Sequence, residues 1–164
     1  MKLPPKTVFT LTSSPLGPLT LAAAGDKLVG IWFEAQAHWP DLSGYAQAPS
    51  HPVLQQAAEQ LAEYFAGQRR QFELSLDLST GTAFQQKVWQ ALLDIPCGQT
   101  CSYTDISVRI GQPKAVRAVG GAVGRNPLSI IVPCHRVVGS HGALTGYAGG
   151  LDRKTALLHL ESSL

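Results

Sequence analysis

The first third of the chain alternates short apolar segments with turn residues. Three segments have the length and apolar content of β-strands, namely residues 7–13, 19–24 and 27–33. Proline and glycine after the first segment, and Gly25 after the second, interrupt the pattern as expected at turns. These segments predict a short antiparallel sheet.

A helical period follows the predicted sheet. Between residues 51 and 65, apolar side chains recur at intervals of three or four, at Val53, Ala57 and Leu61 and then at Tyr64 or Phe65. Such spacing places them on one face of an amphipathic helix. We therefore expect residues 1–78 to form a small α/β domain, in which no catalytic motif is visible.

We interpret residues 79–82 as a linker to a second domain over residues 83–164. Thr82 and Gln85 have the spacing of a capping box, which satisfies free N–H groups at the start of a helix. The apolar period that follows, with Val88 and Leu92 among its members, indicates that this helix packs on a core.

A helix-turn-helix spacing comes next. Ser102 and Asp105 can cap a helix that reaches Ile110, and Gly111 begins a turn. Pro113 suits the first position of a second helix, where a missing N–H does no harm. A short strand leading to the next motif and a final helix complete a mostly helical, winged-helix-like unit that could bind DNA. The predicted fold class is α+β.

The predicted second helix has almost no side-chain bulk. Its residues 115–122 include three alanines and two glycines, although each glycine in a helix costs about 1 kcal/mol relative to alanine. Close packing on another helix would explain this surface, and so would close approach to a nucleic-acid groove. The periodicity favours neither explanation.

Composition and charge narrow the class of protein. The 164 residues are 45% hydrophobic, enough for one good core or two small ones. No apolar run approaches the roughly 18 residues of a membrane span, and no secretory signal is visible. Three cysteines, an odd number, suggest a reducing compartment, so we expect a cytoplasmic protein. Residues 83–164 have a net charge of +4, which would suit a polyanionic partner.

A cysteine and a histidine are adjacent at Cys134 and His135, after the apolar run 129–132. A thiolate is a strong nucleophile, and an imidazole is the usual means of generating one near neutral pH. The alternative is a buried structural cysteine at the end of a core strand. In an extended segment the two side chains would point to opposite faces, so we expect a bridging water rather than direct contact.

The sequence around this pair resembles the O6-alkylguanine-DNA alkyltransferase family. The motif Pro-Cys-His-Arg-Val at residues 133–137 follows Arg-Ala-Val-Gly-Gly-Ala at residues 117–122, and precedes residues 146–150 and 157–161 at the family's spacing. Residues 1–78 resemble the family only loosely.

The resemblance implies a set of catalytic residues: Cys134, His135, Glu161 and Tyr103. Cys134 would be the nucleophile that displaces guanine from the alkyl carbon. Glu161 would accept a hydrogen bond from His135 and so determine its tautomer. Tyr103 would donate to the guanine ring as charge develops there.

The resemblance also implies DNA contacts, assigned to Arg117, Ala118, Gly121, Asn126 and Arg136. The second helix would enter the minor groove, Arg117 would fill the gap left by the extruded base, and Asn126 would brace the turn before the active site. The base pocket would be formed by Tyr147, Ala148 and Gly149. Ala148 departs from a serine found in some members, which leaves recognition of O6 to main-chain N–H groups.

The implied partner is double-stranded DNA that contains O6-alkylguanine, and O4-alkylthymine is a further expected substrate. We expect the protein to act as a monomer, and each molecule to react once. No cofactor is implied. We expect no metal site, because residues 1–78 contain no cysteine and the spacing of Cys97 and Cys101 is poor for zinc. Two other classes remain open: a cysteine hydrolase, and a lesion-binding module that has tryptophan in place of Cys134.

Overall fold

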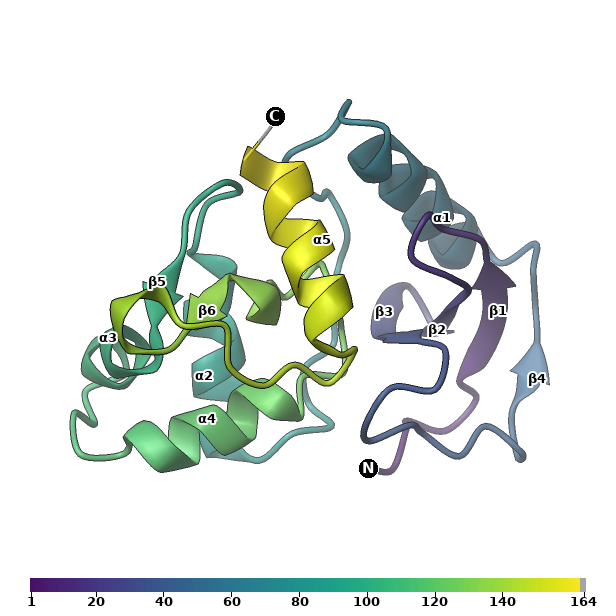
Figure 1. Cartoon of the computed structure of the whole chain (residues 1–164). Coiled ribbons are helices and arrows are strands. Elements are labelled where there is room, and N and C mark those ends of the chain that lie inside the picture. The colour runs from purple at the N-terminus through teal and green to yellow at the C-terminus, as the bar shows by residue number, and fades with distance from the viewer. Residues whose placement is uncertain (163–164) are drawn as a thin grey trace.

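The computed structural model describes residues 1–162 as two lobes with the last helix between them (Figure 1). One lobe contains a sheet covered by α1, and the other contains α2, α3 and α4. The predicted α+β class is confirmed, with a small sheet domain followed by a mostly helical one.

The N-terminal sheet contains four strands: β1 (Val8–Thr12), β2 (Leu19–Ala24), β3 (Lys27–Phe33) and β4 (Ala46–Gln47). Their order is β3-β2-β1-β4, and the first three are antiparallel neighbours, as predicted. The sequence pattern missed β4, which is only two exposed residues long and runs parallel to β1.

Helix α1 (Pro52–Phe65) packs on this sheet, and the His51 ring accepts a hydrogen bond from the backbone N–H of Val53 at its start. Its buried face contains Ala57, Leu61 and Tyr64, as the period predicted. Leu54 is fully buried in place of Val53, which is only half-buried.

Both predicted capping boxes are present in the helical lobe. Thr82 and Gln85 cap α2 (Ala83–Leu93), and Ser102 and Asp105 cap α3 (Tyr103–Arg109). In each box the side chain of Thr82 or Ser102 accepts a hydrogen bond from the backbone N–H of the residue three positions later. The side chain of that later residue accepts one from the backbone N–H of Thr82 or Ser102. The local sequence is therefore sufficient to start these two helices.

The start of the second helix of the helix-turn-helix was predicted wrongly. Helix α4 (Val116–Gly124) begins three residues after Pro113. The backbone N–H of Ala115 donates to the carbonyl of Gln112 at 2.9 Å, which closes a separate turn. Ala115 also has non-helical backbone angles. Residues 113–115, which we expected in the first turn of the helix, therefore belong to the preceding turn.

The strand expected before Cys134 was also wrong. Residues 129–132 form turns, and Ile130 has a positive φ of 76°, which is strained for a β-branched residue. The short strand lies after the cysteine instead, where β6 (Val137–Val138) pairs in parallel with β5 (Cys101–Ser102). Helix α5 (Leu151–Ser162) then runs back between the lobes.

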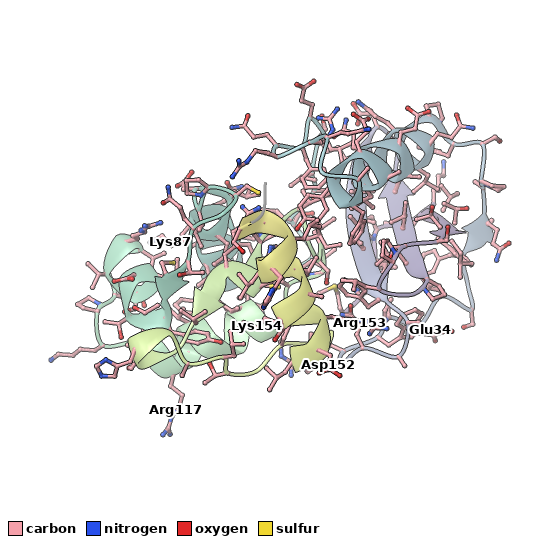
Figure 2. The ribbon with its side chains drawn as sticks, turned by 45° about the horizontal axis from the view of Figure 1, so that its top comes forward. Glu34, Lys87, Arg117, Asp152, Arg153 and Lys154 are labelled. Carbon is pink, nitrogen blue, oxygen red and sulfur yellow. The ribbon has the colours of Figure 1, made fainter. Side chains whose placement is uncertain are left out.

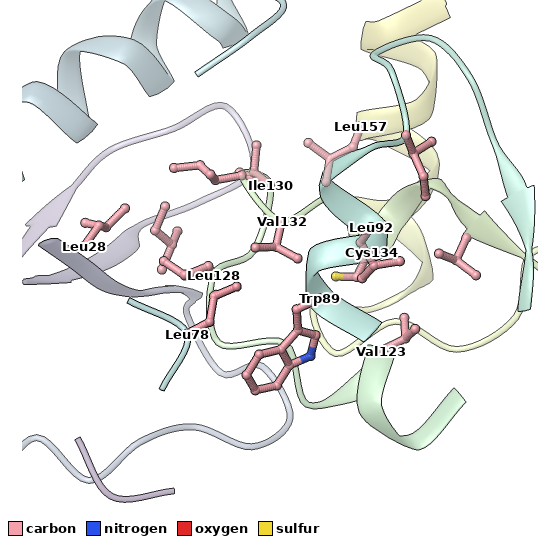
Figure 3. Close-up of a cluster of buried hydrophobic side chains, with 14 of the residues drawn as sticks. Leu28, Leu78, Trp89, Leu92, Val123, Leu128, Ile130, Val132, Cys134 and Leu157 are labelled. Atoms are coloured by element: carbon pink, nitrogen blue, oxygen red, sulfur yellow. The ribbon is translucent and has the colours of Figure 1, made fainter. Parts of the chain in front are cut away.

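One continuous hydrophobic core joins the lobes (Figure 3). Leu28 and Leu78 contribute from the sheet side, and Trp89 contributes from α2, with its indole N–H donating to the carbonyl of Ala122 at 2.8 Å. Leu128 lies between them, in the segment that leads to Cys134. The segment that carries the cysteine is thus packed from both sides. Within residues 1–162 we find no helix with the length and hydropathy to cross a bilayer.

Candidate active site

Cys134 begins a single turn of 3-10 helix, Cys134–Arg136, rather than an extended segment. Its side chain is only 4% exposed and lines a pocket of about 410 Å³. Helices α3 and α4 contribute Tyr103 and Gly120 to that pocket, and the loop before α5 contributes residues 145–148. The prediction of opposite faces for Cys134 and His135 therefore does not apply, because a 3-10 turn does not alternate its side chains.

Asn126 holds the backbone around the cysteine. Its amide Nδ2 donates to the carbonyl of Val132 at 2.7 Å, and its Oδ1 accepts from the backbone N–H of Leu128 at 2.9 Å. The same Nδ2 lies 3.2 Å from Sγ of Cys134. Asn126 is buried, so both ends of its amide are used inside the protein. The sequence predicted a bracing residue but not the contact with sulfur.

The resting state of Cys134 is a thiol. Burial raises the pKa of this thiol above its ordinary value, while the hydrogen bond from Asn126 and the nearby charge of Lys154 act in the opposite direction. A buried thiol needs a base to remove its proton before it can act as a nucleophile.

His135 and Glu161 meet as the resemblance implied. The Nε2 atom of His135 lies 2.7 Å from Oε2 of Glu161, and both side chains are almost completely buried. Because an ionised carboxylate can only accept, Nε2 carries the proton and Nδ1 is left with a lone pair. Among the described residues, this buried Nδ1 has no hydrogen-bond partner.

Arg136 does not lie where we expected it. It was predicted as a DNA contact, but its side chain is buried and its Nε and Nη2 donate to the two oxygens of Glu161 at 2.8 and 2.9 Å. Nη1 donates to the carbonyl of Ile95 at 2.6 Å. A guanidinium used in this way cannot reach a phosphate, so we withdraw Arg136 from the DNA surface.

The charges in this cluster depend on one another. Burial alone would raise the pKa of the Glu161 carboxyl, but hydrogen bonds from His135 and Arg136 outweigh it and hold that pKa well below its usual range. Burial lowers the pKa of His135, although Glu161 opposes this shift. Glu161 is thus ionised and His135 neutral near pH 7, which is the form in which Nδ1 can accept a proton.

The wall of the pocket opposite α4 is the loop that contains Tyr147, Ala148 and Gly149. A side chain at Gly149 would lie 2.8 Å from the Tyr147 ring and 3.0 Å from Phe33, so only glycine fits there. The backbone N–H of Ala37 donates to the carbonyl of Ala148 at 2.9 Å. Ala37 and His38 also line the pocket, and the sequence did not indicate this contribution from the N-terminal lobe.

Two cations hold this loop. The Nζ of Lys154 is buried and donates to the carbonyls of Val137 at 2.7 Å and Thr145 at 2.8 Å. Arg153 donates to the carbonyl of Gly149 in the loop at 3.3 Å. It also points toward the N-terminal lobe (Figure 2), where it donates to the carbonyls of Leu16 and Glu34, each at 3.1 Å. In the sequence both contribute only to the net charge of residues 83–164, because a bond to a main-chain carbonyl leaves no signal in residue types.

Asn126 was also predicted as a DNA contact, and this was wrong, because its side chain is buried and bonded inside the protein. The remaining three predicted contacts lie on the exposed face of α4. Arg117 projects into solvent (Figure 2), and Ala118 and Gly121 are exposed beside it. A Cβ atom added to Gly121 would meet nothing within 4 Å. Close packing inside the protein therefore does not require a glycine there.

The other cysteines lie away from this pocket. Cys97 lines a groove near Arg136, and Cys101 is in β5, where burial raises the pKa of its thiol. Over the described part of the chain, no three side chains of the metal-binding types are grouped to hold an ion.

Fold and site together define a protein of two lobes, in which α3 and α4 are joined by a turn and a buried cysteine is adjacent to a buried histidine. Residues 7–78 match the ribonuclease-like domain of 6-O-methylguanine DNA methyltransferase, and residues 83–163 match its DNA binding domain. The chain therefore belongs to the 6-O-methylguanine DNA methyltransferase family. It is an enzyme of direct-reversal DNA repair, in which an alkyl group is transferred to a cysteine of the protein.

Individual relatives agree over nearly the whole chain. A methylated-DNA–protein-cysteine methyltransferase of Mycobacterium tuberculosis is 51% identical over 155 residues, covering 94% of this chain and 92% of the relative. The constitutive enzyme of Bacillus subtilis is 49% identical over 157 residues, covering 93% and 94%. The crystal structure of Mycobacterium tuberculosis OGT in complex with DNA is similar with a TM-score of 0.89 and 49% identity, covering 95% of this chain and 93% of that one.

Proposed function

We propose that Cys134 is the residue that accepts the alkyl group, and that the group comes from O6 of guanine in duplex DNA. The observation that carries this proposal is that Cys134 lines a pocket that opens beside the exposed face of α4. Neither Cys97 nor Cys101 contributes to that pocket.

The proton of Cys134 passes to Nδ1 of His135 through a bridging water. The unpartnered Nδ1 supports this route, because a buried lone pair without a partner is a natural site for an ordered water. Glu161 stabilises the imidazolium that forms, since it already accepts from Nε2 at 2.7 Å.

In the transfer, Sγ forms a bond to the alkyl carbon while the bond from that carbon to O6 breaks. The electron pair goes to the guanine, whose developing negative charge Tyr103 stabilises by donating a hydrogen bond. Tyr103 lies at the pocket, with its hydroxyl 3.4 Å from Oγ1 of Thr145. The loop residues Tyr147, Ala148 and Gly149 enclose the base, and their main-chain N–H groups recognise O6.

The target base must leave the duplex to reach this buried sulfur. Helix α4 enters the minor groove, where Ala118 and Gly121 allow close approach and Arg117 fills the vacated place in the stack. The exposure of all three residues supports this assignment. Asn126 acts inside the protein, where it braces the turn between α4 and Cys134.

The product is a thioether, which has no ready route of hydrolysis. Each molecule acts once, as a monomer and without a cofactor, on O6-alkylguanine and on O4-alkylthymine. The three free thiols suit a reducing compartment, and we place the protein in the cytoplasm. We also propose a domain division at residues 79–82, which connect the end of the sheet lobe to the start of α2.

Intact-mass spectrometry tests the acceptor. Incubation with excess duplex containing O6-methylguanine should add one methyl group per molecule, located on Cys134 by peptide mapping. Cys134→Ala should accept none, while the matched control Cys101→Ala should accept one. Several turnovers per molecule would indicate a hydrolase, and a label on Cys97 or Cys101 would contradict the assignment.

A further inference from the structure

A tyrosine of the N-terminal domain reaches the carboxylate behind the reactive cysteine. The hydroxyl of Tyr64 donates to Oε2 of Glu161 at 2.6 Å, although the two residues are 97 positions apart in the chain. Tyr64 is 0% exposed and Glu161 is 1% exposed.

The surroundings of Tyr64 fix both its ring and its proton. The ring packs edge-on against Phe65 at 5.3 Å and lies 5.5 Å from Phe72, measured between ring centroids. Burial, together with the negative charge of Glu161, raises the pKa of Tyr64 far above its ordinary value. Its hydroxyl is therefore protonated near neutral pH and can donate to the carboxylate.

The acceptor atom is the one that also serves His135. Oε2 of Glu161 accepts from Tyr64, from Nε2 of His135 at 2.7 Å and from Nη2 of Arg136 at 2.9 Å. Arg136 alone also holds Oε1. Without Tyr64, the carboxylate could follow the guanidinium and turn away from the imidazole.

Glu161 also needs donors because of its place in the helix. It lies in the last turn of α5, where the helix dipole presents its negative end and disfavours an anion. The titratable groups that interact with the Tyr64–Glu161 pair are His135, Arg136 and, near Tyr64, Cys97 and Tyr147. Of these only Arg136 is a permanent cation, so the neutral Tyr64 donor adds stabilisation without adding charge.

We propose that Tyr64 is a positioning residue for the alkyl transfer. Acting through Glu161, it keeps His135 in the tautomer with the proton on Nε2, so that Nδ1 is free to take the proton of Cys134. This inference rests on the proposed function of Cys134 and His135. It gives the N-terminal domain a part in the reactivity of a thiol that belongs to the other domain.

The test compares Tyr64→Phe with Tyr45→Phe. The first keeps the ring and removes one hydroxyl, and the second removes a hydroxyl in the same domain that donates only to the carbonyl of Leu3, at 3.2 Å. Two rates are measured for each protein across a range of pH: single-turnover reaction with free O6-benzylguanine, and alkylation of Cys134 by iodoacetamide, followed by peptide mapping.

Tyr64→Phe should lower both rates at neutral pH about tenfold, the equivalent of one hydrogen bond to a charged group. Its rate of iodoacetamide alkylation should reach the plateau at a higher pH, because less thiolate forms at each pH. Tyr45→Phe should match the unmodified protein in both respects. Affinity for undamaged duplex should be the same in all three proteins, which shows that the helical domain is folded.

The outcomes separate this inference from the proposed function. If the unmodified protein reacts at Cys134 but Tyr64→Phe keeps its rate and its pH profile, Tyr64 only supports packing and the inference is wrong. A profile displaced to lower pH would also overturn it, because the hydroxyl would then merely weaken the carboxylate. If the unmodified protein does not react at Cys134, the proposed function itself fails.

Discussion

The exposed face of α4 and the buried cluster around Glu161 use the same kind of residue in opposite ways. Arg117 projects into solvent from α4, where the neighbouring exposed residues are small. Arg136 is buried, and its N–H groups donate to Glu161 and to a main-chain carbonyl. Both arginines were predicted as DNA contacts. Residue type alone therefore does not decide the role of a charged side chain, which depends on the partners that the fold brings near it.

The two regions also differ in how completely their polar atoms are satisfied. In the cluster, both oxygens of Glu161 have donors within 2.9 Å. On α4 no carboxylate lies within an ion-pair distance of Arg117 among the described residues. The cluster is therefore built for a fixed geometry, and the helix surface for a partner that arrives from outside.

The largest expected effect comes from removing the buried arginine. Arg136→Met leaves the Glu161 charge without its cation, and breaking a buried ion pair in this way costs about 3–5 kcal/mol. We expect the free energy of unfolding, measured by urea denaturation, to fall by that amount.

A double variant is the control for that prediction. Adding Glu161→Gln to Arg136→Met removes the unpaired charge and should restore a large part of the lost stability. If Arg136→Met kept its stability and instead lost affinity for DNA, the surface role first predicted for Arg136 would be right.

The next effect concerns Arg117, which should act only when a base must leave a duplex. Arg117→Ala should slow the repair of O6-methylguanine in duplex DNA about a hundredfold, since filling the vacated stack contributes a few kcal/mol. Its reaction with free O6-benzylguanine should be nearly unchanged. Single-turnover rates at saturating DNA measure both without interference from weaker binding.

Equal losses of rate on the duplex and on the free base would mean that Arg117 supports the pocket instead of the extrusion of the base.

The variant Ala118→Val tests the same exposed face in another way, because it adds bulk without removing a charge. It should weaken duplex binding and leave the free-base reaction intact.

The smallest effect is a dependence of stability on pH, which of the two regions compared only the buried cluster should show. Burial depresses the pKa of His135 in the folded protein, while in the unfolded chain it titrates near about 6.5. Below that pH the unfolded state binds the additional proton, so the free energy of unfolding falls as the pH is lowered, by at most about 1.4 kcal/mol per pH unit.

Urea denaturation at pH 7.5 and pH 5.5 measures this dependence. In His135→Gln the free energy of unfolding should fall less between the two pH values, because the imidazole no longer contributes. In Arg117→Ala it should fall as much as in the unmodified protein. An unchanged decline in His135→Gln would show that its burial does not disfavour the charged ring.

Local signals in the sequence predicted most of the fold. The capping pairs Thr82–Gln85 and Ser102–Asp105 work within a single turn of the chain, so their residue types are sufficient to start a helix. The start of α4 was missed because Pro113 can occupy either a first helical position or a turn, and the hydrogen bond from Ala115 to Gln112 decides for the turn. The apolar run 129–132 suggested a strand, because a buried turn has the same composition as a buried strand.

The site was predictable only as far as the motif reached. Cys134 and His135 were candidates because they are adjacent, and Glu161 was added by a resemblance. The structure brings His135 and Glu161 together. Tyr64 could not be found in this way, because it appeared as one apolar position on an amphipathic helix and its partner is 97 residues away. Long-range contacts of this kind leave no periodic signal in a sequence.

The loop around Tyr147 has a consequence for the thermodynamics of recognition. Lys154 and Arg153 tie it to β6 and to the other lobe through main-chain carbonyls, so the loop has little conformational entropy left to lose when a base enters. Binding energy from the DNA is then not consumed in ordering this wall. If this loop encloses the base as we propose, the wall of the cavity exists before the lesion is met, and a damaged base would be selected by its fit to a shape that is already in place.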